Sequence, residues 1–365
     1  MATQPPIRVA LDAGPLYGHR TGVGVAVEGM MRSLRGRADV TVVPYLTSFR
    51  SRPDPDHRRL PLPGIVASHL WSRADRPTAD RWLGDVDVVH GTNYWAPPSS
   101  RPTVVSVYDC WFLRHPDDAI PVVRRAGRML RRAVARGAWI HASSDATADE
   151  VRSLLATDRV TTVHPGAPEP PAQVEATPAG LAGIAGRRFV VAIGTEERRK
   201  DVPLLVSAFD RLAGGHPDVE LVLAGAGGDD TDRITSAISA AGSTTRDRIH
   251  RLGTIDETTK AWLLRHAAAL AYPSLDEGFG FPILEAQLAG TPVVATSVGS
   301  IPEVAGDAAV LVTDRDPLTL AEAIATTLDG PDRLGLIEAG YRNAARFRWS
   351  TAVEQLVELY RTAMR

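Results

Sequence analysis

The sequence has almost none of the residues that cross-link small secreted proteins or bind structural zinc. Its 365 residues include one cysteine, Cys110, which excludes an internal disulfide and any zinc site built from several cysteines. The sequence also has no apolar run long enough for a membrane span, which needs roughly 20 apolar residues. The uncharged stretch 286–302 is shorter than this and contains proline and glycine. The N-terminus has no basic segment followed by an apolar one. We therefore expect a cytoplasmic protein.

The chain also has little net charge and very little lysine. Lys and Arg total 41 and Asp and Glu total 43, giving a formal net charge of -2, which argues against a dedicated nucleic-acid-binding protein. The hydrophobic fraction of 44% argues against disorder. Only Lys200 and Lys260 are lysines, and the other 39 basic residues are arginines. The position of each lysine is therefore informative.

Short β-branched runs alternate with helical segments, which is typical of parallel βαβ units. In the first half, the expected strands are 7–13, 39–46, 86–90, 102–109 and 138–143, the expected helices are 119–136 and 144–156, and 50–64 is expected to be a loop. Five prolines in 165–178 predict a linker. Beyond it, strands are expected at 188–195, 219–225, 268–274, 292–296 and 308–313, and helices at 201–212, 256–265, 281–290, 316–328, 332–346 and 350–364.

The pattern predicts an α/β protein with two doubly wound domains. We assign 1–170 to the first domain and 185–346 to the second. Ligands of such folds bind beyond the carboxyl ends of the strands, so the cleft between two facing domains is the expected site.

The most informative segment is EGFGFPILE, residues 277–285. Gly278 and Gly280 allow a close backbone approach to a ligand, and Pro282 suits the start of a helix. The helix N-terminus favours an anion such as a diphosphate, while Glu277 and Glu285 can accept hydrogen bonds from sugar hydroxyls. An ordinary strand–turn–helix with an acidic first turn is the alternative.

Two further loops carry chemistry compatible with a phosphate. The segment GTEERRKD, residues 194–201, follows an expected strand and brings Arg198, Arg199 and Lys200 to its carboxyl end, although a solvated charge cluster is the alternative. The segment TGVG, residues 21–24, follows the first strand as a glycine-rich loop. It lacks the GxGxxG spacing, so it supports a nicotinamide enzyme only weakly.

Together these segments resemble the retaining GT-B glycosyltransferases of family 4 over nearly the whole chain. EGFGFPILEAQLAGTPVVAT (277–296) and GSIPEVAG (299–306) are similar to the family's E-x7-E region, and GTEERRKDVPLLVSAF (194–209) is similar to its donor-diphosphate loop. TGVGVAVEGMMRSL (21–34) and SVYDCWFLRHP (106–116) resemble its N-terminal glycine-rich loop and the strand-end motif near the donor sugar. The resemblance implies two Rossmann-like domains, an acceptor-side one and a nucleotide-sugar-binding one, with the last helix, 350–365, returning to the first.

The resemblance also implies the roles of individual residues in binding a nucleoside diphosphate sugar. Arg199 and Lys200 would neutralise the diphosphate, Glu277 would contact the donor sugar, and Glu285 would bind the ribose hydroxyls. The implied donor contacts also include Thr195, Gly278, Phe279, Gly280 and Phe281 around the sugar and phosphates, Leu252 and Gly253 beside the base, and Gly22 and Gly24 from the first domain. It further implies transfer of a hexosyl group with retention, without a metal ion and without a covalent intermediate, to a glycan, lipid-linked or small-molecule acceptor.

The chain departs from the family pattern at two positions. Tyr108-Asp109 stands where the family often has His-Asp, and a phenol cannot shuttle a proton near pH 7. The resemblance implies that Tyr108 and Asp109 lie beside the donor sugar, and we expect the bulkier phenol to favour a sugar such as a 6-deoxyhexose. Thr195 stands where some members have Arg. A sugar-nucleotide epimerase of the same build and a catalytically impaired nucleotide-sugar-binding module stay as alternatives.

The helix around Arg124–Arg136 is rich in arginine and amphipathic. Such a helix can lie on an anionic membrane at the inner face, although an ordinary surface helix packed by its apolar stripe is the favoured interpretation. His90, His141 and His164 follow strands without the spacing of metal ligands, so no metal is predicted. The sequence does not indicate an oligomeric state.

Overall fold

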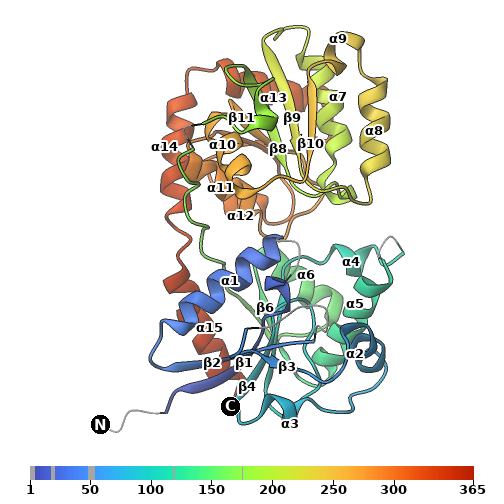
Figure 1. Ribbon diagram of the computed structural model, residues 1–365, viewed down its shortest axis with the longest axis vertical. Coiled ribbons are helices and arrows are strands. Elements are labelled where there is room, and N and C mark those ends of the chain that lie inside the picture. Colours follow the sequence, from blue (N-terminus) through green and yellow to red (C-terminus); the bar gives the residue numbers. More distant parts are fainter. Residues whose placement is uncertain (1–4, 18–20, 48–53, 118–119, 175) are drawn as a thin grey trace. The chain divides into compact units, whose positions relative to one another are not determined.

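The computed structural model describes residues 5–17, 21–47, 54–117, 120–174 and 176–365. The chain forms two compact units, each with its own parallel sheet (Figure 1). The first unit combines Met1–Gly166 with Phe347–Arg365, and the second is Ala167–Arg346.

The first unit contains a seven-stranded parallel sheet in the order β3-β2-β1-β4-β5-β6-β7. The strands are β1 (Ile7–Asp12), β2 (Val40–Leu46), β3 (Arg58–Arg59), β4 (Val88–Gly91), β5 (Thr103–Val107), β6 (Trp139–Ala142) and β7 (Val160–Thr162). The chain runs outward from β1 to β3 and then returns to β4 on the other side of β1. The order therefore reverses between β1 and β4, which is where doubly wound sheets bind ligands.

Helices cover this sheet: η1 (Gly14–Leu16), α1 (Gly22–Arg35), α2 (Gly64–Trp71), α3 (Asp80–Leu83), α4 (Trp111–Arg114), α5 (Pro121–Ala135) and α6 (Asp145–Leu155). Two sequence-based predictions were wrong here. Gly22 and Gly24 lie in the first turn of α1 rather than in a loop, because Thr21 adopts the extended N-cap conformation and the Thr21 carbonyl accepts a hydrogen bond from Val25. The expected loop 50–64 contains β3, which pairs with the end of β2, while 48–53 lies outside the described residues.

The C-terminal helix α15 (Trp349–Ala363) completes the first unit, as predicted (Figure 1). It packs beside α1, and glycine at two positions makes the approach feasible. A Cβ added to Gly29 would lie 2.1 Å from the Trp349 ring, and one added to Gly166 would lie 2.4 Å from it. The apolar stripe of α15, including Val353, Leu356 and Val357, is buried against the sheet.

The second unit repeats this construction with a six-stranded parallel sheet in the order β10-β9-β8-β11-β12-β13. The strands are β8 (Arg188–Ile193), β9 (Val219–Ala224), β10 (Ile249–Gly253), β11 (Ala269–Tyr272), β12 (Val293–Thr296) and β13 (Val310–Val312). The order reverses between β8 and β11. The central strands are buried on both faces, which is typical of a parallel sheet covered by helices.

The helices of the second unit are η2 (Ala179–Leu181), η3 (Arg198–Lys200), α7 (Val202–Leu212), α8 (Thr231–Ala240), α9 (Ser243–Arg246), α10 (Glu257–His266), α11 (Phe281–Ala289), α12 (Ile301–Ala305), α13 (Pro317–Asp329) and α14 (Arg333–Ala344). Two apolar clusters hold them on the two faces of the sheet. The helices expected at 201–212, 256–265, 281–290, 316–328 and 332–346 correspond to α7, α10, α11, α13 and α14.

Candidate donor site

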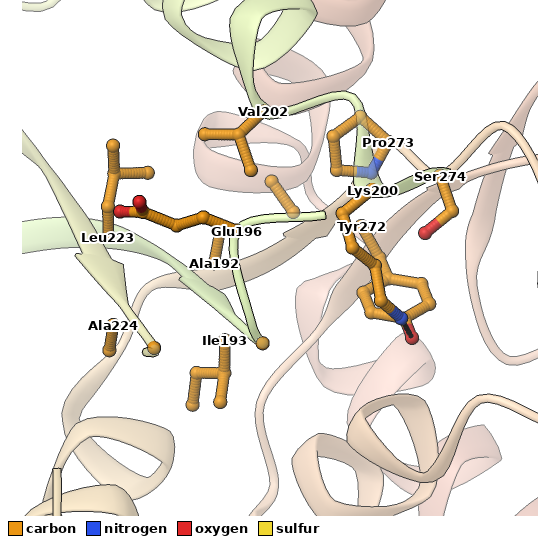
Figure 2. Close-up of a pocket in the computed structure, with 13 residues that line it drawn as sticks. Ala192, Ile193, Glu196, Lys200, Val202, Leu223, Ala224, Tyr272, Pro273 and Ser274 are labelled. Atoms are coloured by element: carbon orange, nitrogen blue, oxygen red, sulfur yellow. Dashed lines mark hydrogen bonds between the residues drawn. The ribbon is translucent and has the colours of Figure 1, made fainter. Parts of the chain in front are cut away.

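A pocket opens at the carboxyl ends of β8, β9 and β11, where the strand order of the second sheet reverses (Figure 2). It is partly open, and the space not filled by protein atoms there, open solvent included, is about 420 Å³. Gly194 and Glu196 follow β8, Gly225 follows β9, and Tyr272 ends β11. Lys200 reaches the same pocket from η3, and Figure 2 shows its amino group meeting the Tyr272 hydroxyl.

The carboxylate of Glu277 is bound by three side chains beside this pocket. Arg199 Nη1 lies 3.1 Å from Oε1 and 3.2 Å from Oε2, and Lys200 Nζ donates to Oε2. The Tyr272 hydroxyl donates to the same Oε2 at 2.7 Å and accepts from Lys200 Nζ at 2.5 Å. Arg199 Nε also pairs with Glu197 at 2.7 Å. The structure thus brings the predicted residues Arg199, Lys200 and Glu277 together, and adds Tyr272.

The protonation states of these groups follow from burial and from their neighbours. Burial alone would raise the pKa of Glu277, but the charges of Lys200 and Arg199 outweigh it and lower that pKa to about 2. Burial and the nearby Arg199 lower the pKa of Lys200, and Glu277 opposes that shift. Burial raises the pKa of Tyr272 well above its usual value. At neutral pH the cluster therefore contains an ionised carboxylate and a neutral phenol, held by cations.

Backbone contacts fix Glu277 and the cations in place. The N–H of Leu275 donates to the Arg199 carbonyl at 2.7 Å, which ties the segment after β11 to η3. The carbonyl of Glu277 accepts from the N–H and the hydroxyl of Ser300, both at 2.9 Å. Gly299 has φ +52°, and a Cβ there would lie 2.5 Å from that carbonyl. The GSIP segment after β12 is therefore part of the support of Glu277.

The helix α11 begins directly after the glycine-rich turn. Gly280 is its N-cap with φ 93°, a conformation that favours glycine, and Pro282 stands in the first turn. Its N-terminus carries the backbone N–H groups that suit an anion. Phe279 and Phe281 are both buried, with ring centroids 5.0 Å apart.

The second glutamate of the motif has a cation of its own. Glu285 lies on α11, and its Oε1 accepts a hydrogen bond from Lys260 Nζ of α10 at 2.9 Å. Burial opposes the charge on Lys260, but Glu285 and Glu257 outweigh it and raise the pKa of Lys260. Each of the two lysines in the chain is thus bonded to one glutamate of the E-x7-E segment. Lys260 was missed as a site residue, and lysine scarcity was the one signal that could have found it.

The remaining predicted residues of this unit lie at the ends of β8 and β10. Thr195 belongs to the segment after β8, which packs against the segment after β9 so closely that a Cβ on Gly225 would lie 1.7 Å from the Gly194 carbonyl oxygen. Leu252 and Gly253 end β10, and the Gly253 carbonyl accepts from Gly225 N at 2.8 Å. Of the predicted site residues, only Lys200 belongs to the described pocket lining.

The predicted residues of the first unit form a different environment. Tyr108 follows β5 and is buried, and its hydroxyl has no hydrogen-bond partner among the described residues. Asp109 accepts from the Tyr94 hydroxyl at 2.9 Å and from Trp111 N at 3.1 Å. Gly22 and Gly24 start α1, and their role beside a diphosphate stays a prediction.

A buried chain of hydrogen bonds underlies the carboxyl ends of these strands. His141 Nε2 must donate to the Val163 carbonyl at 3.0 Å, so its Nδ1 accepts from the Ser106 hydroxyl at 2.8 Å. Ser106 then accepts from His90 Nε2 at 2.8 Å, and His90 Nδ1 accepts from the Tyr360 hydroxyl at 2.7 Å. Burial lowers the pKa of His141 to about 4 and that of His90 well below its usual value. Both imidazoles are therefore neutral, and the network connects α15 to the sheet.

Asp12 lies at the point where the order of the first sheet reverses. It ends β1, is 5% exposed, and accepts from Gly14 N at 2.9 Å, while the Thr92 hydroxyl after β4 donates to its backbone carbonyl at 2.7 Å. Burial raises the pKa of Asp12 to about 7. Sequence reasoning did not single it out, because an aspartate at the end of a strand has no distinguishing local pattern.

One group of metal-ligand residues lies in the first unit, away from the predicted site residues in sequence. Ligand atoms of Asp54, Asp56 and His57 lie within 4.8 Å of one another. Asp56 is bound by Arg35 at 2.7 Å, and His57 Nδ1 shares a hydrogen bond with the Tyr17 hydroxyl at 2.8 Å. These contacts account for the cluster, and no metal site is assigned to it.

Comparison with known proteins agrees with the resemblance seen in the sequence. Residues 187–330 match the family described as Glycosyl transferases group 1, and residues 20–169 match Glycosyltransferase Family 4. A D-inositol 3-phosphate glycosyltransferase 1 of Catenulispora acidiphila is 32% identical over 314 residues, covering 77% of this chain and 73% of that protein. The chain belongs to glycosyltransferase family 4. It is a retaining glycosyltransferase that uses a nucleoside diphosphate sugar.

A second relative and a solved structure are also similar to this chain. An O-antigen chain mannosyltransferase B of Escherichia coli is 27% identical over 286 residues, covering 75% of this chain and 74% of that protein. A crystal structure of HepE from Anabaena in complex with UDP and glucose superposes with a TM-score of 0.72 at 17% identity, covering 98% of this chain and all of that one. The fold is therefore GT-B, as predicted. Within the described part of this family 4 enzyme, no helix is long and apolar enough to cross a bilayer.

Proposed function

We propose that this family 4 enzyme transfers a hexosyl group from a nucleoside diphosphate sugar bound in the second unit to an acceptor hydroxyl, with retention and without a metal ion. The observation that carries the proposal is the cluster of Arg199, Lys200 and Glu277 at the point where the second sheet reverses its strand order. A pair of cations held beside a pocket at that point suits a diphosphate.

Charge development explains what the two cations do. When the bond between the sugar C1 and the phosphate oxygen breaks, negative charge grows on the leaving diphosphate and positive charge grows on the sugar. The acceptor oxygen bonds to C1 on the same face, and the proton of the acceptor passes to the leaving phosphate oxygen. Lys200 and Arg199 stabilise the negative charge on the leaving diphosphate as it forms. This lowers the barrier of the reaction rather than only strengthening the binding of the donor. They supply the positive charge that a metal ion supplies in other transferases.

Glu277 has two partners in succession in this proposal. Without donor, its carboxylate balances Lys200 and shares Arg199 with Glu197, so these two cations of low exposure have acidic partners. When the diphosphate arrives, it competes for these cations, and Glu277 accepts hydrogen bonds from hydroxyls of the sugar. Tyr272 holds the carboxylate through its hydroxyl throughout.

The nucleoside half of the donor binds to the elements that lie next to the cluster of Arg199, Lys200 and Glu277. Glu285, oriented by Lys260, accepts hydrogen bonds from the ribose hydroxyls. Leu252 and Gly253 at the end of β10 lie beside the base, and Thr195 approaches the phosphates. The backbone of Gly278, Phe279, Gly280 and Phe281 surrounds the sugar and phosphates at the start of α11.

The relatives support a hexose as the transferred sugar. One of them is named a mannosyltransferase, and HepE was crystallised with UDP and glucose. Tyr108 and Asp109 are proposed to select the sugar, with the phenol favouring a 6-deoxyhexose. Equal turnover of mannose and fucose donors by wild type and by Tyr108→His would contradict this selection. The acceptor is a glycan, a lipid-linked sugar or a small molecule.

Following the donor over time tests the reaction class. Transfer, or slow hydrolysis, releases nucleoside diphosphate, and the rate should persist in excess EDTA. Interconversion of two sugar nucleotides without such release would instead indicate an epimerase, and consumption of no donor would indicate a binding module.

A thermal-shift screen of UDP, GDP, dTDP and ADP tests the donor site. A nucleotide at about 100 times its Kd adds roughly 2.7 kcal/mol of stability. The matching nucleotide should shift wild type and should shift Glu285→Ala much less. The proposal is contradicted if none of the four nucleotides shifts wild type.

A further inference from the structure

Helices α2 and α5 of the first unit lie side by side (Figure 1). Arg125 Nε of α5 donates to the Ser68 hydroxyl of α2 at 3.1 Å, and Arg132 Nε donates to Asp75, just after α2, at 3.2 Å. Both bonds join residues 57 positions apart in sequence. The same offset brings Ile65 to the level of Val122, so the two helices start at the same end of this surface.

Large apolar side chains are exposed at that common end. Ile65 is 63% exposed, Val66 49%, Ile120 61% and Val122 50%. These four are half of the eight exposed large hydrophobic side chains among the described residues. We define the α2–α5 surface as this apolar end together with the exposed arginines beside it. Clustered exposure of this kind marks an interaction surface, whereas single exposed side chains do not.

The charge on the same two helices has one sign. Neither α2 (GIVASHLW) nor α5 (PVVRRAGRMLRRAVA) contains Asp or Glu. Arg124, Arg128 and Arg131 are exposed and recur at helical spacing, so they form one outward stripe. Asp75 is paired with Arg132 at 2.8 Å and also with Arg136.

Acidic residues do occur in the sequence before α5. Asp117 and Asp118 precede Ile120, and Asp118 lies outside the described residues. The outward stripe of α5 begins beyond them. The four apolar side chains together with this stripe combine the two features that hold a helix at a membrane interface, an apolar face that enters the acyl boundary and arginines that contact anionic headgroups.

We propose that the α2–α5 surface docks this enzyme peripherally on a bilayer that contains anionic lipid. The apolar ends of the two helices enter the boundary between headgroups and acyl chains, and Arg124 and Arg128 contact the phosphates. A protein partner or a second copy of this chain would cover apolar side chains without requiring a stripe of exposed arginines, so the charge favours lipid. Vesicle binding requires no donor or turnover, so it can fail independently of the proposed transferase activity.

Vesicle sedimentation of the full chain tests this docking. Vesicles of phosphatidylcholine alone are compared with vesicles that also contain phosphatidylglycerol, at low and high salt. Wild type should sediment with the anionic vesicles at low salt, and much less at high salt because salt screens the arginines. Failure to bind anionic vesicles at low salt, or equal binding to neutral vesicles, overturns the proposal.

Matched variants separate this surface from general charge and hydrophobicity. Arg124→Gln with Arg128→Gln should weaken binding by about 25-fold, about fivefold for each arginine. Arg211→Gln with Arg246→Gln, two exposed arginines of the second unit, should leave it unchanged. Ile65→Asn with Val122→Asn should weaken it at least about tenfold, while Leu318→Asn with Leu334→Asn, which alters exposed leucines elsewhere, should not.

Unchanged thermal unfolding of each variant shows that it folds. Equal losses in the surface variants and their matched controls would overturn the proposal. The mass of the protein in solution without vesicles, measured by analytical ultracentrifugation, completes the test. If wild type is a dimer, Ile65→Asn with Val122→Asn converts it to a monomer, and neither form binds lipid, the surface serves self-association instead.

Discussion

The two units share one strand order around their first strands but differ in charge at the place where that order reverses. In the second unit, Lys200 and Arg199 surround an ionised Glu277. In the first unit, the corresponding edge carries Asp12, whose pKa is raised to about 7, and the buried Tyr108. The neutral imidazoles of His90 and His141 are buried beneath them. The same topology thus places strand ends at both edges, whereas the residues at those ends determine the charge of each edge. The pair of cations is what makes the second unit suit the diphosphate of the proposed donor.

Removing Lys200 has the largest expected effect, because it takes one cation away from the charged edge. Lys200→Met should lower the rate of nucleoside diphosphate release by about 100- to 1,000-fold, since removal of a preorganised group that stabilises transition-state charge typically costs that much. Steady-state kinetics with the donor found by the nucleotide screen measures it. The matched control is Arg198→Ala, which removes the exposed arginine two positions earlier. Equal losses in both variants would show that the loop provides only diffuse charge.

Asp12→Asn probes the corresponding edge of the first unit through stability. The pKa of Asp12 is higher in the folded than in the unfolded chain, so its contribution to stability is complete below about pH 4 and is lost as pH rises towards about 7. Asp12→Asn has no such loss. It should therefore be more stable than wild type at pH 8, by roughly 2–4 kcal/mol, and similar to it at pH 4.

Urea unfolding at both pH values measures the Asp12 effect. Tyr45 and Tyr108 face Asp12, and burial raises the pKa of each, so neither titrates in this range. Asp39→Asn is the control of opposite sign, because the hydrogen bond from Arg37 lowers the pKa of Asp39 and the wild-type carboxylate is stabilising above that pKa. A stability difference between Asp12→Asn and wild type that does not vary with pH would contradict the assignment.

Replacing Lys260 tests whether its ion pair with Glu285 contributes to binding of the nucleoside rather than to the rate of the reaction. Lys260→Met leaves Glu285 without its cation and should weaken nucleoside diphosphate binding about tenfold, or ~1.4 kcal/mol, with kcat little changed. Isothermal titration and steady-state kinetics separate the two effects. Glu257→Gln removes the exposed partner of Lys260, at 2.9 Å, and should change binding little. A drop in kcat without a change in affinity would assign Lys260 to the reacting end of the donor.

Removing the hydroxyl group from either of two buried tyrosines of the first unit has the smallest expected effect, a change in the free energy of unfolding. Tyr108→Phe removes a hydroxyl that has no hydrogen-bond partner among the described residues, so the free energy of unfolding should change by less than about 1 kcal/mol. Tyr360→Phe leaves His90 Nδ1 without its donor and should cost about 1–3 kcal/mol. Thermal or urea unfolding compares them. Equal losses would mean that the Tyr108 hydroxyl has a partner in solution.

The sequence predicted the elements whose local pattern agrees with their environment. Strands of buried parallel sheets read as continuous apolar runs, and VELVLA in β9 or VVAT in β12 are buried at every position. The helix α8 (TDRITSAISA) was missed because its small polar residues give weak helical periodicity and it buries only Ile234. The short strand β3 was missed because arginine has little strand preference, and its pairing with β2 is a tertiary contact.

The part of the candidate site that could be predicted consists of residues in recognisable sequence motifs. Glu277, Arg199 and Lys200 stand in two motifs whose meeting follows from neighbouring parallel strands. Tyr272 reads as an ordinary strand residue, and Lys260 meets Glu285 only because α10 packs on α11, across 25 residues of sequence. Long-range pairs of this kind leave no local pattern.

Glu277→Gln provides the most direct test of the central claim, that Glu277 and the donor diphosphate compete for Lys200 and Arg199. The measurement is the Kd of the matching nucleoside diphosphate by isothermal titration, together with donor turnover. The account predicts that the variant binds the nucleoside diphosphate more tightly, by about tenfold or ~1.4 kcal/mol, because the cations are released, while turnover of the donor falls. Weaker or unchanged nucleoside diphosphate binding by Glu277→Gln would contradict it.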